Sequence, residues 1–125
     1  MVLGKNDLKN IMEQYDLRPS KSLGQNFVID PNTILKIIRA TNIEKGDQIL
    51  EIGPGLGSLT TQLSNNNKVV AIELDRYLIP ALEEVLLQYG QRENVEIIQE
   101  DAMKIDWKAF FETRSGTWKM VANLP

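Results

Sequence analysis

The feature that most constrains the fold is a glycine-rich turn that directly follows an apolar strand pattern. Residues 48–52 read Gln-Ile-Leu-Glu-Ile, and residues 53–57 after them read Gly-Pro-Gly-Leu-Gly. A second acidic residue, Glu73, follows the next apolar run, residues 68–72. A strand, a glycine turn and a second strand that ends at an acid are typical of the nucleoside-binding half of a Rossmann-type sheet.

The spacing of the glycines distinguishes two classes of nucleoside-binding enzyme. A dinucleotide fingerprint needs its third glycine at position 58, where this chain has Ser58. The pattern from Glu51 to Gly57, Glu-x-Gly-x-Gly-x-Gly, is instead typical of enzymes that bind S-adenosylmethionine. A nicotinamide-dependent oxidoreductase shares the turn and Glu73, so this class stays open as the alternative.

Composition excludes several kinds of site. The 125 residues include no cysteine and no histidine, which rules out disulfides, thiolate nucleophiles, imidazole bases and the usual zinc sites. The sequence has no apolar run long enough to span a bilayer and no signal-peptide pattern. We therefore expect a cytoplasmic protein of one domain at most, with no metal and no membrane partner.

The charge is unevenly distributed along the chain. Residues 1–40 carry six basic and four acidic side chains, whereas residues 41–125 carry eight and thirteen. The net charge of −3 is unlike that of a nucleic-acid-binding domain, which is usually basic. If the substrate is RNA, most phosphate contacts are expected to come from elsewhere.

Apolar spacing divides the chain into two regions. It predicts a helix over residues 7–15 and a second helix over residues 30–40, with a polar loop at residues 18–28 between them. We assign residues 1–47 to N-terminal helices and a loop that covers the cofactor. Residues 48–125 are assigned to part of a Rossmann-like domain.

Strand and helix patterns alternate through the second region. Strands are predicted at residues 48–52, 68–72, 95–99 and 118–122, with helices at residues 56–63, 78–89 and 106–113 between them. This order predicts an α/β fold with a parallel sheet and right-handed crossovers. Because a doubly wound sheet normally continues beyond a fourth strand, we expect the chain to be the N-terminal part of a larger protein.

Three predicted strands are followed by groups that suit a nucleoside. Gly53, Gly55 and Gly57 allow positive φ angles and close approach of a ligand to the backbone. Glu73 lies where an acid accepts hydrogen bonds from ribose hydroxyls. Asp101 can accept from an adenine amino group, and Ala102 leaves room for the ring. For each carboxylate, a solvated charge at a strand end is the alternative.

The fourth strand is followed by Asn123 and Leu124. In a doubly wound sheet the first and fourth strands are neighbours at the switch point where ligands bind, so Asn123 is expected to face the glycine turn. Its amide oxygen and the Leu124 carbonyl can accept hydrogen bonds from an exocyclic amine, which favours the pyramidal geometry that attack requires. A plain loop is the alternative, because Asn and Pro are common turn residues.

Five blocks of the sequence together resemble the ribosomal RNA adenine dimethyltransferases. They are SLGQNFV at residues 22–28, EIGPGLG at 51–57, IELD at 72–75, EDA at 100–102 and NLP at 123–125. The resemblance runs from about residue 20 to the last residue. The first two blocks look more like the small-subunit enzyme than like the related antibiotic-resistance enzymes of the large subunit.

The resemblance implies a class I S-adenosylmethionine-dependent methyltransferase, a monomer that dimethylates adenine amines in ribosomal RNA of the small subunit by direct in-line transfer. The implied cofactor contacts are Gln25, Asn26 and Val28 over the cofactor, Gly53 and Gly55 under its methionine part, Glu73 at the ribose, Asp101 and Ala102 at the adenine, and Asn123. The implied catalytic residues, which hold the target adenine, are Asn123, Leu124 and Pro125.

The sequence departs from the family pattern at two places. The family more often has leucine where this chain has Val28, which is a mild change. The aromatic residue expected after Pro125, which stacks on the target base, is absent. The chain by itself is therefore expected to be inactive, and a non-catalytic factor for ribosomal RNA or ribosome assembly is the alternative function.

The remaining candidates have structural interpretations. Trp107 and Trp118 are expected to pack in the core and at the sheet edge, and Glu51 is expected to organise its turn. Asp75 is expected to cap the next helix.

Overall fold

The computed structural model describes residues 5–17 and 31–122. Its elements in chain order are α1 (Lys5–Gln14), α2 (Pro31–Thr41), β1 (Gln48–Ile52), α3 (Thr60–Leu63), β2 (Val69–Glu73), α4 (Ile79–Gln88), the 3₁₀ turn η1 (Arg92–Asn94), β3 (Val95–Gln99), the 3₁₀ turn η2 (Ala102–Lys104), α5 (Trp107–Glu112) and β4 (Trp118–Ala122). Three strands match their predicted bounds. The second is shifted by one residue, so Glu73 is the last residue of β2.

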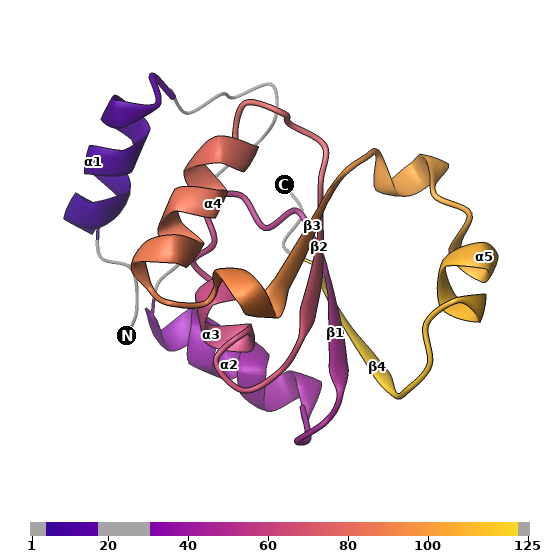
Figure 1. Cartoon of the computed structure of the whole chain (residues 1–125). Helices are drawn as coiled ribbons and strands as arrows, with labels where there is room; N and C mark the ends of the chain where they lie inside the picture. Colours follow the sequence, from indigo (N-terminus) through magenta and orange to yellow (C-terminus); the bar gives the residue numbers. More distant parts are fainter. Residues whose placement is uncertain (1–4, 18–30, 123–125) are drawn as a thin grey trace.

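The four strands form one parallel sheet in the order β3-β2-β1-β4. Figure 1 shows α1, α2, α3 and α4 on one side of this sheet and α5 on the other. The predicted neighbourhood of the first and fourth strands is confirmed, because β1 pairs with β4 along its whole length. The connections from β1 to β2 and from β2 to β3 run through α3 and α4 on one side of the sheet, whereas the connection from β3 to β4 runs through α5 on the other side. The switch point therefore lies between β1 and β4.

Alternation along the strands gives the sheet two apolar faces. Ile49 and Ala71 belong to the core under α2, α3 and α4, whereas Leu50 and Ile72 belong to the core under α5. Glu51 and Glu73 each lie two positions after a residue of the first core. Both carboxylates are therefore on the side of the sheet that carries most of the helices.

The two N-terminal helices pack onto this helical layer. Ile11 of α1 lies in a core cluster with Leu56 and Val85, and Ile34 of α2 is fully buried with Ile49. The predicted apolar faces of both helices are confirmed where the structure describes them. The division of the chain at residue 47 remains a prediction.

The helix predicted over residues 56–63 begins only at Thr60. Leu56 and Leu59 are buried as expected, but they lie in turns before the helix. Gly55 and Gly57 have φ angles of 58° and 90°, which are incompatible with a right-handed helix. The glycine turn thus extends further along the chain than the leucine spacing indicated.

An aromatic cluster covers the other face of the sheet. Its rings are those of Trp107, Phe110, Phe111 and Trp118, with centroids 5.0–6.0 Å apart. Phe110 is buried in the core under α5, and both tryptophans pack against it. The predicted packing role of the tryptophans is confirmed.

Within residues 5–17 and 31–122, no helix is long and apolar enough to cross a bilayer.

Candidate functional site

The glycine turn lies at the carboxyl edge of the sheet, between β1 and α3. The φ angle is 75° at Gly53, and the Gly53 N–H donates to the Ile72 carbonyl over 2.9 Å, which extends the ladder between β1 and β2 by one bond. The Gly57 N–H donates to the Pro54 carbonyl over 2.9 Å, which closes the turn. The backbone of the turn is thus fixed at the point where parallel sheets bind ligands.

The three glycines have different structural roles. Gly57 is buried, and a Cβ atom there lies 2.9 Å from Leu82 Cδ1 and 3.6 Å from Val85 Cγ1. Gly57 is therefore required for packing against α4. Gly53 and Gly55 are partly exposed, so their backbone stays accessible to a ligand. Gly53 and Gly55, the two glycines that the resemblance implies under the cofactor, are thus open to a ligand, whereas Gly57 contributes to packing. Their contact with a cofactor remains a prediction.

Replacing Gly57 with alanine is expected to destabilise the fold by about 1–3 kcal/mol more than replacing Gly90. Both glycines have positive φ angles, 90° and 71°, so both variants carry backbone strain. A Cβ atom at Gly90 meets nothing within 4 Å, so only the Gly57 variant adds a steric clash. Urea unfolding of both variants measures the difference, and equal losses contradict the packing role.

Glu73 joins the end of β2 to the glycine turn. Its Oε1 accepts a hydrogen bond from the Gly55 N–H at 3.0 Å, and its Oε2 accepts one from the Asp75 N–H at 2.9 Å. Burial raises the pKa of this carboxyl, and the two N–H groups act in the opposite direction. The sequence did not predict this connection. Each oxygen keeps a second lone pair, so the contact with Gly55 is compatible with ligand binding.

Glu51 is a buried carboxylate at the end of β1. Its side chain is 1% exposed, and its Oε1 accepts a hydrogen bond from the Thr60 Oγ1 at 2.5 Å. Its Oε2 has no hydrogen-bond partner in the part of the chain that the structure describes. Burial raises the pKa of Glu51 to about 7, with a smaller contribution from the nearby Glu73 charge. The bond to Thr60 ties β1 to α3 across the turn, which agrees with a role in organising it.

Sequence reasoning missed Thr60, although a signal was present. An acid inside an apolar strand needs a hydrogen-bond partner. Thr60, at the start of the helix after the turn, is a nearby side chain that can donate.

Asp101 and Ala102 lie at the end of β3. The Asp101 Oδ1 accepts a hydrogen bond from the Met103 N–H at 2.9 Å and so caps η2. The side chain is partly exposed, and its other oxygen forms no hydrogen bond with a described residue. Ala102 is partly exposed beside it. A carboxylate oxygen at this strand end is therefore free to accept from a ligand.

The prediction for Asp75 needs correction. Its Oδ1 accepts from the Tyr77 N–H at 2.9 Å, in the turn before α4. The cap position of α4 is Leu78, which has no side-chain cap. Asp75 therefore stabilises the preceding turn and does not cap the helix.

Six of the predicted site residues lie outside the described residues. They are Gln25, Asn26, Val28, Asn123, Leu124 and Pro125. Their roles remain predictions. The register of β1 and β4 pairs Ile52 with Ala122, so the described part of β4 ends opposite the residue before Gly53.

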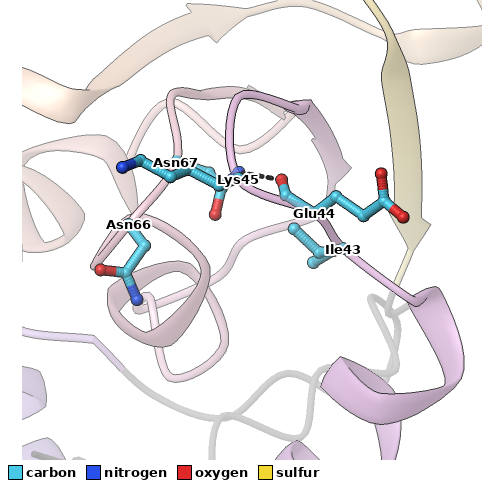
Figure 2. Close-up of a pocket in the computed structure, with 5 residues that line it drawn as sticks. All are labelled: Ile43, Glu44, Lys45, Asn66 and Asn67. Carbon is cyan, nitrogen blue, oxygen red and sulfur yellow. Dashed lines mark hydrogen bonds between the residues drawn. The ribbon is translucent and has the colours of Figure 1, made fainter.

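A hollow of about 400 Å³ lies at the opposite edge of the sheet (Figure 2). Its lining residues, 43–45 and 66–67, precede β1 and β2. The Asn67 Nδ2 donates to the carbonyls of Glu44 and Asp47 at 3.0 and 2.8 Å, which holds the two loops together. Because parallel sheets bind ligands at the carboxyl ends of their strands, this hollow is not the nucleoside site.

Among the described residues, no group of three acids could hold a metal ion.

Sequence comparison points to one family. The family model for ribosomal RNA adenine dimethylase matches residues 17–125. Ribosomal RNA small subunit methyltransferase A of Clostridioides difficile is 43% identical over 123 residues, which cover 96% of this chain and 42% of that protein. The protein of the same name in Pelotomaculum thermopropionicum is 44% identical, with 94% and 42% covered. The chain spans about two fifths of the length of these relatives.

Solved structures agree on the fold. A dimethyladenosine transferase from Plasmodium falciparum has a TM-score of 0.63 and 30% identity, covering 80% of this chain and 34% of that chain. An O-methyltransferase from Bacillus cereus, solved with SAH, has a TM-score of 0.67 and 15% identity, covering 99% and 56%. The predicted α/β fold of class I S-adenosylmethionine-dependent methyltransferases is confirmed.

Proposed function

Because the chain belongs to the ribosomal RNA adenine dimethylase family, we propose that it forms the cofactor-binding part of an enzyme that dimethylates adenine amines in small-subunit ribosomal RNA. The observation that carries this proposal is the arrangement at the carboxyl edge of the sheet. Two partly exposed glycines lie at the end of β1, and Glu73 is bonded to one of them from the end of β2. The same edge carries Asp101 at the end of β3.

The described residues fit S-adenosylmethionine. Gly53 and Gly55 are partly exposed and have no side chain, so the methionine part can approach their backbone closely. Their positive φ angles carry no steric cost in glycine. The remaining lone pairs of Glu73 can accept from the ribose hydroxyls, and the free oxygen of Asp101 can accept from the adenine amine. The two carboxylates thus supply acceptors for the hydroxyl and amino donors of the nucleoside.

The bound cofactor supplies an activated methyl group. The residues after β4 hold the target adenine, with the Asn123 amide oxygen and the Leu124 carbonyl accepting from its exocyclic amine. Oxygens that accept from the amine would keep its lone pair on the nitrogen. For each methyl group gained, an N–C bond would form, the S–C bond of the sulfonium would break to leave a thioether, and the amine would release a proton to solvent. Alignment of the methyl donor with the attacking amine would contribute up to about 7–11 kcal/mol of the barrier reduction. No residue of the chain forms a covalent intermediate in this scheme.

Replacing Asp101 with serine is expected to weaken S-adenosylmethionine binding by about 10- to 100-fold, because one hydrogen bond to a charged group is lost. Serine is a good cap residue, so the bond to the Met103 N–H can be kept while the carboxylate is removed. Calorimetric titration measures the affinity, and urea unfolding of the same variant is the control. An unchanged affinity argues against the adenine contact.

The test of the whole proposal is transfer of labelled methyl groups from S-adenosylmethionine to small-subunit ribosomal RNA by the full-length protein. We expect dimethylated adenosine in the digested RNA. A protein that binds both the cofactor and this RNA without producing methylated adenosine contradicts the proposed activity and favours a non-catalytic assembly factor.

A further inference from the structure

Helix α2 differs from the other described helices in its charge. Its sequence contains Lys36 and Arg39 and no acidic residue. The described helices α1, α4 and α5 each contain at least one acid, and α3 has no charge. In a chain with a net charge of −3, a helix with cations only is unusual.

These cations lie along one exposed stripe. Asn32, Lys36 and Arg39 are spaced at i, i+4 and i+7, which places them on one face of the helix, and all three are exposed. Ile34, on a different face, is fully buried in the core. From Asn32 to Arg39 the stripe is about 10 Å long. The core thus fixes which face of α2 is presented to solvent.

No neighbour in the described part of the chain neutralises the charges of the stripe. Neither the Lys36 nor the Arg39 side chain forms an ion pair or hydrogen bond with a described residue. By contrast, Arg114 pairs with Glu96 at 3.0 Å, and Lys119 lies 3.8 Å from Asp47. Among residues 5–17 and 31–122, no side chain competes with an external anion for the cations of α2.

A further exposed cation, Lys45, lies in the loop after α2. In Figure 2, Lys45 and the carboxylate of Glu44 point in opposite directions, and Lys45 also has no ion-pair partner among the described residues. We call Lys36 and Arg39 the α2 basic face. Lys45 follows it in the chain and lines the hollow at the amino edge of the sheet.

The position of α2 relates this face to the proposed site. Ile34 packs with Val121 of β4, and α2 leads into β1 through residues 42–47. The end of α2 is therefore near the amino edge of the sheet, on the side that also carries α3 and α4 (Figure 1). Because α2 shares a core with β4, an RNA strand that brings a base to the end of β4 can continue past this helix.

We propose that the α2 basic face binds the phosphate backbone of the RNA substrate. This inference rests on the proposed function, because it takes its partner from there. Lysine and arginine contacts to phosphates release counterions, so they contribute affinity that falls with salt and carries little sequence preference. Such contacts position the RNA, whereas the residues after β4 hold the base.

The test compares two double variants of the full-length protein that remove the same charge. Lys36→Gln with Arg39→Gln changes the proposed face, and Lys104→Gln with Lys108→Gln changes exposed lysines between β3 and β4. Binding to purified small-subunit ribosomal RNA is measured from low to high salt, with S-adenosylmethionine affinity as a fold control. For the α2 variant we expect the slope of log affinity against log salt to fall by about 2, about one for each lost phosphate contact. The control variant keeps the parental slope.

Two results overturn this inference in distinguishable ways. If the unmodified protein binds RNA and transfers methyl groups, but both double variants have the same slope, only the role of α2 fails and its cations form an ordinary solvated face. If the unmodified protein does not bind RNA, the proposed function fails as well.

Discussion

Replacing Asn123 with alanine is expected to slow methyl transfer by about 10²- to 10³-fold, similar to the loss of one oxyanion-hole group in other enzymes. The reason is the weak nucleophilicity of the adenine amine, whose lone pair is delocalised into the ring. Without the accepting amide oxygen, the amine is not held in the geometry that attack requires. Transfer by the full-length protein is measured at saturating S-adenosylmethionine and RNA, so that the rate does not report weaker binding.

A suitable control for this variant is Asn66→Ala. Asn66 is an exposed asparagine on the hollow at the opposite edge of the sheet. Its replacement is expected to leave the transfer rate unchanged. If Asn123→Ala transfers methyl groups at the parental rate, Asn123 does not have the catalytic role assigned to it.

Replacing Glu51 with glutamine is expected to change how stability depends on pH. The pKa of Glu51 is raised from its ordinary value of 4.5 to about 7, so the folded protein holds a proton that the unfolded chain releases in this range. The stabilising effect of this proton is complete below about pH 4.5 and is lost as the pH rises through 7. Above pH 7 the buried charge costs about 3 kcal/mol, which glutamine avoids.

The measurement is urea unfolding of the parental protein and the variant at pH 5 and pH 8. We expect similar stabilities at pH 5, and a variant that is more stable than the parent at pH 8. Glu112→Gln, at an exposed position of α5, controls for the loss of one negative charge. A Glu51→Gln variant that is less stable than the parent at pH 8 shows that the charged carboxylate has a partner that stabilises it.

The sheet could be predicted from the sequence because its signals are local. Each strand is a short apolar run with turn residues on both sides, and the order of strands and helices restricts the topology to a parallel sheet. The adjacency of β1 and β4 followed from this topology alone. The start of α3 could not be predicted from leucine spacing, because the φ angles of Gly55 and Gly57 override the helical periodicity.

Some features of the predicted site are local in the sequence, and others are not. Glu73 and Asp101 could be proposed as site residues because one ends β2 and the other follows β3, and both positions are visible in the sequence. The bond from the Gly55 N–H to Glu73 was missed, because it joins backbone and side chain across two strands. The same holds for the pairing of Glu51 with Thr60, and for the packing of Gly57 against Leu82. Contacts between elements depend on the register of the sheet, which cannot be deduced from local sequence patterns alone.

Calorimetric titration of the 125-residue chain shows whether S-adenosylmethionine binds at the carboxyl edge of the sheet. NAD serves as the competing nucleotide, because an oxidoreductase shares the glycine turn and Glu73. We predict saturable binding of S-adenosylmethionine and none of NAD, with the affinity reduced in the Asp101→Ser variant. Preferential binding of NAD, or no binding of S-adenosylmethionine by a folded chain, contradicts the proposed cofactor site.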